Sequence, residues 1–186
     1  MKSKIFGFGQ IIPGLKIHGK DAPYPVLNER AIRAGAGILF AFAFFAFLNA
    51  LLAKEYVFLE YFIMLFLIEM SIRIFINPKF APISRFANWI VRKQKPDYVG
   101  AIQKKFAWIL GFSMALTMFF IVIVFQIRGT LPFSFCLVCL SLLWLETSCG
   151  ICVGCKLYAG LQHIGWIKKP EVKPACPGGT CSLKKP

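Results

Sequence analysis

Long runs of apolar residues alternate with basic segments along this chain of 186 residues. A helix needs roughly twenty apolar residues to cross about 30 Å of hydrocarbon. The first run has no charge after Arg33, whereas the second carries Glu60, Glu69 and Arg73 among its apolar residues. The pattern predicts four transmembrane helices, joined in pairs by short gaps, at about 31–53, 56–76, 106–127 and 131–152.

Composition and charge place these helices in a membrane and predict their direction. With 58% apolar and 16% charged residues, the chain is not an ordinary soluble domain. Its net charge is +14, and 20 of the 22 Lys and Arg residues fall in the two ends or the central loop. The positive-inside rule therefore places both termini and the central loop in the cytoplasm. The basic charge is a topology signal, so the expected partner is a lipid bilayer and not nucleic acid.

The central loop carries a shorter pattern of its own. Apolar residues at helical spacing face basic residues across it, which predicts a short amphipathic helix lying on the inner leaflet, with Ile83, Phe86, Ala87 and Ile90 on its apolar face. The predicted fold class is an all-α polytopic membrane protein. Its parts are a cytoplasmic arm at 1–24, a four-span domain at 25–162 and a flexible basic tail at 163–186.

The fourth apolar stretch, 131–161, is too long for one span, since 31 residues of helix measure about 46 Å. Glu146 and the glycines Gly150 and Gly154 mark the expected break near the cytoplasmic face. All seven cysteines lie in or after this stretch: Cys136, Cys139, Cys149, Cys152, Cys155, Cys176 and Cys181.

Three of these cysteines, Cys149, Cys152 and Cys155, form two overlapping C-x-x-C units. They are either reactive thiols or small residues that pack between helices. If the helix breaks at Gly150 or Gly154, a new helix N-terminus would stabilise a thiolate, and Lys156 would add positive charge.

Three other polar or thiol groups of this stretch are Glu146, Cys136 and Cys139. Glu146 is a proton acceptor for a thiol or the partner of an arginine on another helix. Cys136 and Cys139 are expected to pack. On an unbroken helix they would not share a face with the inner three cysteines, because Cys152 would lie about 160° around the axis from Cys136.

The basic tail holds the last two cysteines, Cys176 and Cys181, around a Pro-Gly turn. This pair would close a disulfide, hold a soft metal ion or exchange with the inner thiols. The alternative is a free tail whose thiols stay reduced in the cytoplasm.

Four motifs together resemble one protein family. They are Pro-Val-Leu-Asn-Glu-Arg at 25–30, Pro-Lys-Phe-Ala-Pro at 78–82, Lys-Phe-Ala at 105–107 and Gly-Ile-Cys-Val-Gly-Cys-Lys-Leu-Tyr at 150–158. Over about 25–160 the chain resembles the DUF4395 family of bacterial membrane proteins, whose motif G-F-C-x-G-C-x-x-Y matches Cys152, Cys155 and Tyr158. The resemblance implies a bacterial inner membrane. It also implies partners of the thioredoxin-like or rhodanese-like kind, because members are encoded beside or fused to such proteins.

The leading hypothesis is a thiol redox or sulfur relay protein with Cys152, Cys155 and Cys149 as reactive thiols and Cys176 and Cys181 as a mobile relay. The expected supporting residues are Asn28, Glu29, Arg30, Glu146, Lys156 and Tyr158. A second hypothesis is a carrier of Cu, Hg or Zn ions, for which Cys176 and Cys181 are the candidate ligands. A third is a membrane scaffold without catalysis. The sequence assigns no cofactor, no enzyme class and no oligomeric state, and the small number of spans leaves a homo-oligomer as one option.

Overall fold

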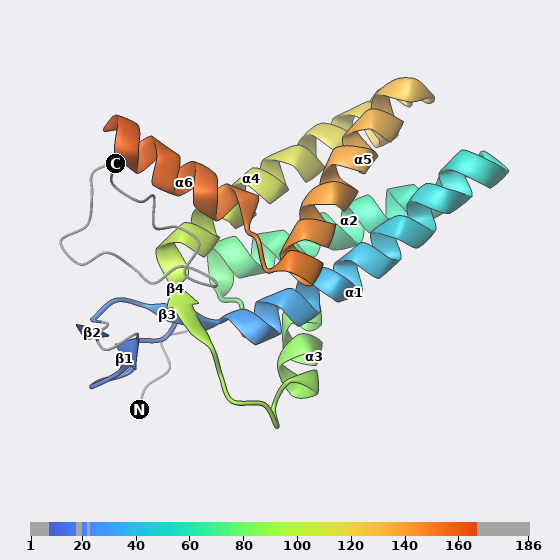
Figure 1. Ribbon diagram of the computed structural model, residues 1–186. Helices are drawn as coiled ribbons and strands as arrows, with labels where there is room; N and C mark the ends of the chain where they lie inside the picture. Colours follow the sequence, from blue (N-terminus) through green and yellow to red (C-terminus); the bar gives the residue numbers. More distant parts are fainter. Residues whose placement is uncertain (1–7, 18–19, 22, 167–186) are drawn as a thin grey trace.

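The computed structural model describes residues 8–17, 20–21 and 23–166, which form a predominantly helical protein (Figure 1). The helices are α1 (Glu29–Leu48), α2 (Val57–Ser71), α3 (Pro82–Ile90), α4 (Ala101–Phe119), α5 (Thr130–Trp144) and α6 (Val153–Ile164). The strands are β1 (Lys16–Ile17), β2 (Lys20–Asp21), β3 (Val26–Asn28) and β4 (Tyr98–Gly100). The long helices α1, α2, α4 and α5 pack against one another as a bundle. Each of them continues into a π-helical turn at Asn49–Ala53, Ile72–Ile76, Phe120–Val124 or Leu145–Cys149.

Three of the helices are long and apolar enough to cross a membrane, when their π-helical turns are included: Glu29–Ala53, Ala101–Val124 and Thr130–Cys149. Many large apolar side chains on the outside of the bundle are exposed, among them Phe42, Leu52 and Tyr61. Such surfaces suit contact with lipid chains. The prediction of a helical membrane protein is therefore confirmed by the length and composition of these three helices.

The chain segments before α1 and before α4 are tied together by a short antiparallel sheet. In this sheet β3 pairs with β4, with Leu27 opposite Val99. The pattern of the sequence predicts no strand here. The pairing aligns the starts of α1 and α4, and α4 begins at Ala101, ahead of the expected start at 106. Lys104, expected in the central loop, lies instead inside α4 and is fully buried. We call this end of the bundle the polar end.

The amphipathic helix of the central loop is present as α3, and Glu69 fixes its start. The Glu69 carboxylate accepts hydrogen bonds from the backbone N–H of Ile83 (3.1 Å) and of Ser84 (3.0 Å). It also pairs with Arg73 on its own helix at 2.7 Å. A carboxylate at this position satisfies N–H groups that have no partner within the helix.

The apolar residues of α3 divide between two surroundings. Ile83 and Ala87 are buried, and α3 packs on α1. Phe86 and Ile90, expected on the same face, are exposed beside Trp89. The expected single face is thus divided, because the protein covers Ile83 and Ala87 and leaves Phe86 and Ile90 exposed.

Helix α6 leaves the end of α5 in a new direction and packs against α4 (Figure 1). The contact depends on Gly154, since a Cβ atom there would lie 2.6 Å from the Cβ and 2.7 Å from the Cα of Ala107. Such distances are too short for any real side chain, so only glycine permits this approach of the two helices.

We expect Gly154→Ala to lower the free energy of unfolding by about 1–3 kcal/mol, because the added methyl group forces α6 off α4. Gly160→Ala is the matched control on the same helix, since nothing lies within 4 Å of a Cβ at that position. It should raise the stability by up to about 1 kcal/mol through helix propensity alone. Denaturant titration in detergent measures both, and equal effects at the two glycines would contradict the packing.

Candidate functional site

Arg33 of α1 stabilises the backbone where the helix ends after α5. Its guanidinium donates hydrogen bonds to the carbonyl oxygens of Thr147 (2.9 Å) and Ser148 (3.2 Å), which have no partner at the end of a helix. Gly150 then adopts a left-handed conformation with φ of +65°. The expected break is confirmed at this glycine, and the chain turns there from α5 into α6.

Cys152 occupies the position immediately before α6 and has an extended backbone conformation. Its carbonyl accepts the first hydrogen bond of the new helix from the N–H of Lys156 at 3.1 Å. Cys155 follows in the first turn of α6. The two cysteines are 7% and 1% exposed and pack together against Ala107 and Ala159. The new helix N-terminus considered in the sequence analysis therefore lies at Cys152.

The two thiols differ in acidity because the Cys155 thiol donates a hydrogen bond to the sulfur of Cys152. A hydrogen bond from the Cys155 thiol lowers the pKa of Cys152, aided by the positive charge of Lys104 and by the Cys155 backbone N–H, although burial and Glu146 oppose this. The same hydrogen bond, together with burial, raises the pKa of Cys155. This arrangement favours a thiolate at Cys152 beside a protonated thiol at Cys155, and such a pair can form a disulfide.

The cation beside the thiols is Lys104, which the sequence analysis did not single out. Its ammonium group is fully buried and lies 3.0 Å from Glu29 and 2.9 Å from Glu146. These three residues come from α1, α4 and the turn after α5, so the ion pairs join three helices at the polar end. Glu146 thus pairs with a lysine where an arginine was expected. No spacing in the sequence links positions 29, 104 and 146.

The remaining predicted site residues lie around this centre in different ways. Cys149 is the exposed member of the inner three cysteines. Asn28 caps α1, and its side chain accepts hydrogen bonds from the backbone N–H groups of Arg30 (3.2 Å) and Asp97 (3.3 Å). Arg30 is exposed and donates to Gln94 at 3.2 Å.

Two more of the predicted residues belong to α6. Lys156 is exposed, so the buried charge beside the thiols comes from Lys104 in its place. Tyr158 is buried against Phe106, with 5.4 Å between the ring centroids. Cys176 and Cys181 lie outside the described residues.

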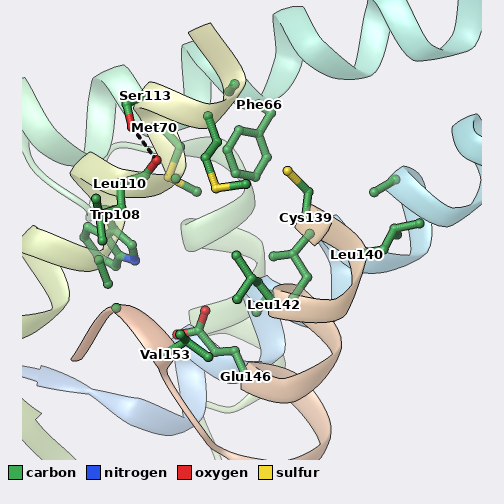
Figure 2. Close-up of a pocket in the computed structure, with 18 of the residues that line it drawn as sticks. Phe66, Met70, Trp108, Leu110, Ser113, Cys139, Leu140, Leu142, Glu146 and Val153 are labelled. Atoms are coloured by element: carbon green, nitrogen blue, oxygen red, sulfur yellow. Dashed lines mark hydrogen bonds between the residues drawn. The ribbon is translucent and has the colours of Figure 1, made fainter. Parts of the chain in front are cut away.

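An apolar cavity of about 330 Å³ within the bundle extends to Cys152. Figure 2 shows part of its lining, including Cys139 and Glu146. Cys152 and Glu146 line it at the polar end, and Cys136 and Cys139 line it farther along α5. The sequence analysis placed Cys136 and Cys152 on different faces of one unbroken helix, whereas in the structure both residues line this cavity. The angle worked out for an unbroken helix does not apply, because the chain breaks at Gly150.

The described residues form no cluster suited to bind a metal ion. Among the described residues, no group of three or more His, Cys, Asp or Glu side chains is arranged to hold a metal ion. The five cysteines within 8–166 are free thiols.

Removing the buried cation should be costly. We expect Lys104→Met to lower the free energy of unfolding by about 3–5 kcal/mol, because Glu29 and Glu146 would remain buried without a counter-charge. The matched control is Lys105→Met. Lys105 lies over the ring of Phe8 at 5.3 Å, so its loss should cost at most about 1 kcal/mol. Denaturant titration in detergent compares the two, and similar losses would contradict the ion-pair network.

The acidity of Cys152 predicts a specific pH dependence. Because its pKa is lowered, its thiolate persists to lower pH than that of a free cysteine, whose pKa is about 8.5. Alkylation by iodoacetamide, mapped by mass spectrometry, should therefore reach half its maximal rate at a lower pH than in a free cysteine peptide. Cys155→Ala removes the supporting thiol and should move the midpoint upward. A wild-type midpoint at or above that of a free cysteine peptide would refute this assignment.

Comparison with known proteins assigns the chain to a family. The sequence model of the family described as "Domain of unknown function (DUF4395)" matches residues 27–163. This range runs from β3 to the last turn of α6 and contains the thiol pair and the three members of the buried ion-pair network, Glu29, Lys104 and Glu146. No curated protein and no solved structure matches the chain. The chain belongs to the DUF4395 family, as its motifs predicted.

Proposed function

We propose that this protein is a thiol redox protein of the bacterial inner membrane, in which Cys152 and Cys155 exchange electrons with a thioredoxin-like partner in the cytoplasm. The observation that carries the proposal is the placement of Cys152. It lies at the start of a helix, beside the thiol of Cys155 and near the buried ammonium of Lys104. Helix N-termini and neighbouring cations favour thiolates, and the thiolate is the form that attacks disulfides.

In the proposed topology α2 is a fourth span. With its π-helical turn it covers Val57–Ile76, about 30 Å of helix. Its charges are paired, because Glu69 pairs with Arg73 and Glu60 pairs with Arg128 at 2.6 Å. Paired charges near the ends of a span are tolerated in a membrane. The excess of Lys and Arg then places the polar end and both termini on the cytoplasmic side.

The partner would first exchange with Cys149, the exposed thiol three residues before Cys152. In the exchange, a thiolate attacks one sulfur of a disulfide, forms one S–S bond and releases the other sulfur as a thiolate. The reducing equivalents of the partner's dithiol pass in this way to the Cys152–Cys155 disulfide. Cys176 and Cys181, outside the described residues, form part of the proposal as a relay between the partner and the inner thiols.

The two cysteines should respond differently to substitution. We expect diamide to form a Cys152–Cys155 disulfide in the full chain in detergent, and reduced thioredoxin to open it. Cys155→Ser should leave Cys152 reactive, so that with diamide, which takes up the two electrons and two protons of the two thiols, it accumulates a mixed disulfide with a thioredoxin whose second active-site cysteine is replaced by serine. Cys152→Ser should leave little such adduct at Cys155, because that thiol is only 1% exposed, and its burial still raises its pKa after the hydrogen bond with Cys152 is lost.

Mass spectrometry of the cysteine peptides reads both results. An added sulfur atom on Cys152 after incubation with a rhodanese-like protein would assign the exchange to sulfur instead of electrons. The proposal fails if diamide forms no disulfide between Cys152 and Cys155, or if both serine variants behave like the wild-type chain, as a packing scaffold would.

A further inference from the structure

The cavity beside the thiol pair is apolar along most of its length and polar at one end. Its volume of about 330 Å³ lies within the range of about 300–1,000 Å³ that is typical of small-molecule sites. Phe66 and Met70 of α2 and Leu142 of α5 form part of its wall (Figure 2). Cys152 and Glu146 line the polar end. A ligand that fits this shape has an apolar body and a polar head directed at Cys152.

Trp108 marks the polar end with an unused hydrogen-bond donor. The residue is 94% buried, and its ring contacts Phe8 edge-on and the guanidinium of Arg73. None of the hydrogen bonds found for the described residues is donated by its indole N–H. Figure 2 shows the indole nitrogen on the side of the ring that faces the cavity. Buried tryptophans usually find a partner for this group, so the cavity lacks an acceptor at this point.

We propose that the cavity binds a membrane-soluble quinone, which places a carbonyl oxygen on the indole N–H of Trp108 and its ring against Cys152. A quinone supplies the missing acceptor, a flat ring for the aromatic wall and an apolar tail for the rest of the cavity. A lipid acyl chain would fill the apolar part but offers no acceptor and no use for a thiol pair.

This inference rests on the proposed function, and it names the electron acceptor. When the pair is reduced, the Cys152 thiolate and the Cys155 thiol give up two electrons and form one S–S bond. The quinone takes up these two electrons, the Cys155 proton and one proton from water, and it leaves as the hydroquinone. Electrons brought by a cytoplasmic partner would thus enter the pool of membrane quinones.

The test uses the full chain in nanodiscs of phosphatidylethanolamine and phosphatidylglycerol, reduced and then freed of reductant. With decylubiquinone as the probe, we expect one molecule of hydroquinone per chain and a disulfide between Cys152 and Cys155. Trp108→Phe keeps the ring but removes the donor, and it should weaken quinone binding about threefold to tenfold, as the loss of one hydrogen bond does.

A matched pair of leucines on α5 tests whether the reaction takes place in the cavity. Leu142 lines the cavity, whereas Leu137 is exposed on the outside of the same helix. Leu142→Trp fills the cavity and should slow hydroquinone formation at least tenfold. Leu137→Trp adds the same side chain toward the lipid and should leave the rate within about twofold of wild type. Equal rates in both variants would overturn the assignment of the site.

A parallel experiment with diamide as the oxidant distinguishes failure of the quinone inference from failure of the thiol redox function. If the wild-type pair forms its disulfide with diamide but yields no hydroquinone, the quinone inference is overturned and the thiol function stands. If neither oxidant forms the disulfide, the thiol function itself fails. If decylubiquinone binds without accepting electrons, or if only copurified lipid occupies the cavity, the inference is likewise overturned.

Discussion

The buried ammonium group of Lys104 determines how the polar end of this protein is organised. A lysine inside a membrane helix bundle persists only with a counter-charge, and here Glu29 and Glu146 provide it from two other helices. The three residues fix the relative positions of α1, α4 and the end of α5. Because Cys152 follows that end closely, the same charge that joins the helices also lies near its sulfur.

The helix break explains why the cysteines of α5 and α6 belong to one region of the molecule. Arg33 satisfies the last carbonyl groups of the π-helical turn that follows α5, and Gly150 lets the chain turn there without strain. Gly154 then lets α6 approach α4 closely enough to bury Cys155. The result is a thiol pair at a helix start, at the polar end of an apolar cavity.

Much of this could be predicted from the sequence. Apolar runs, glycine positions and the C-x-x-C spacing are local signals, and they predicted the long helices, the break before α6 and the inner cysteines. Lys104 could not be found in this way, because its partners are 75 residues before and 42 residues after it. The pairing of β3 with β4 and the cavity also depend on contacts between distant segments. A lysine just before an apolar run looks like a topology signal, although here it lies in the core.

The measurement that tests the account most directly is a redox titration of the Cys152–Cys155 pair. The full chain in detergent is equilibrated with glutathione buffers of increasing oxidation, and the disulfide is quantified by mass spectrometry. The account predicts a reversible two-electron transition between about −120 and −270 mV, the range of thioredoxin-like oxidoreductases. A pair that stays reduced in every buffer would contradict the account and leave the cysteines a packing role alone.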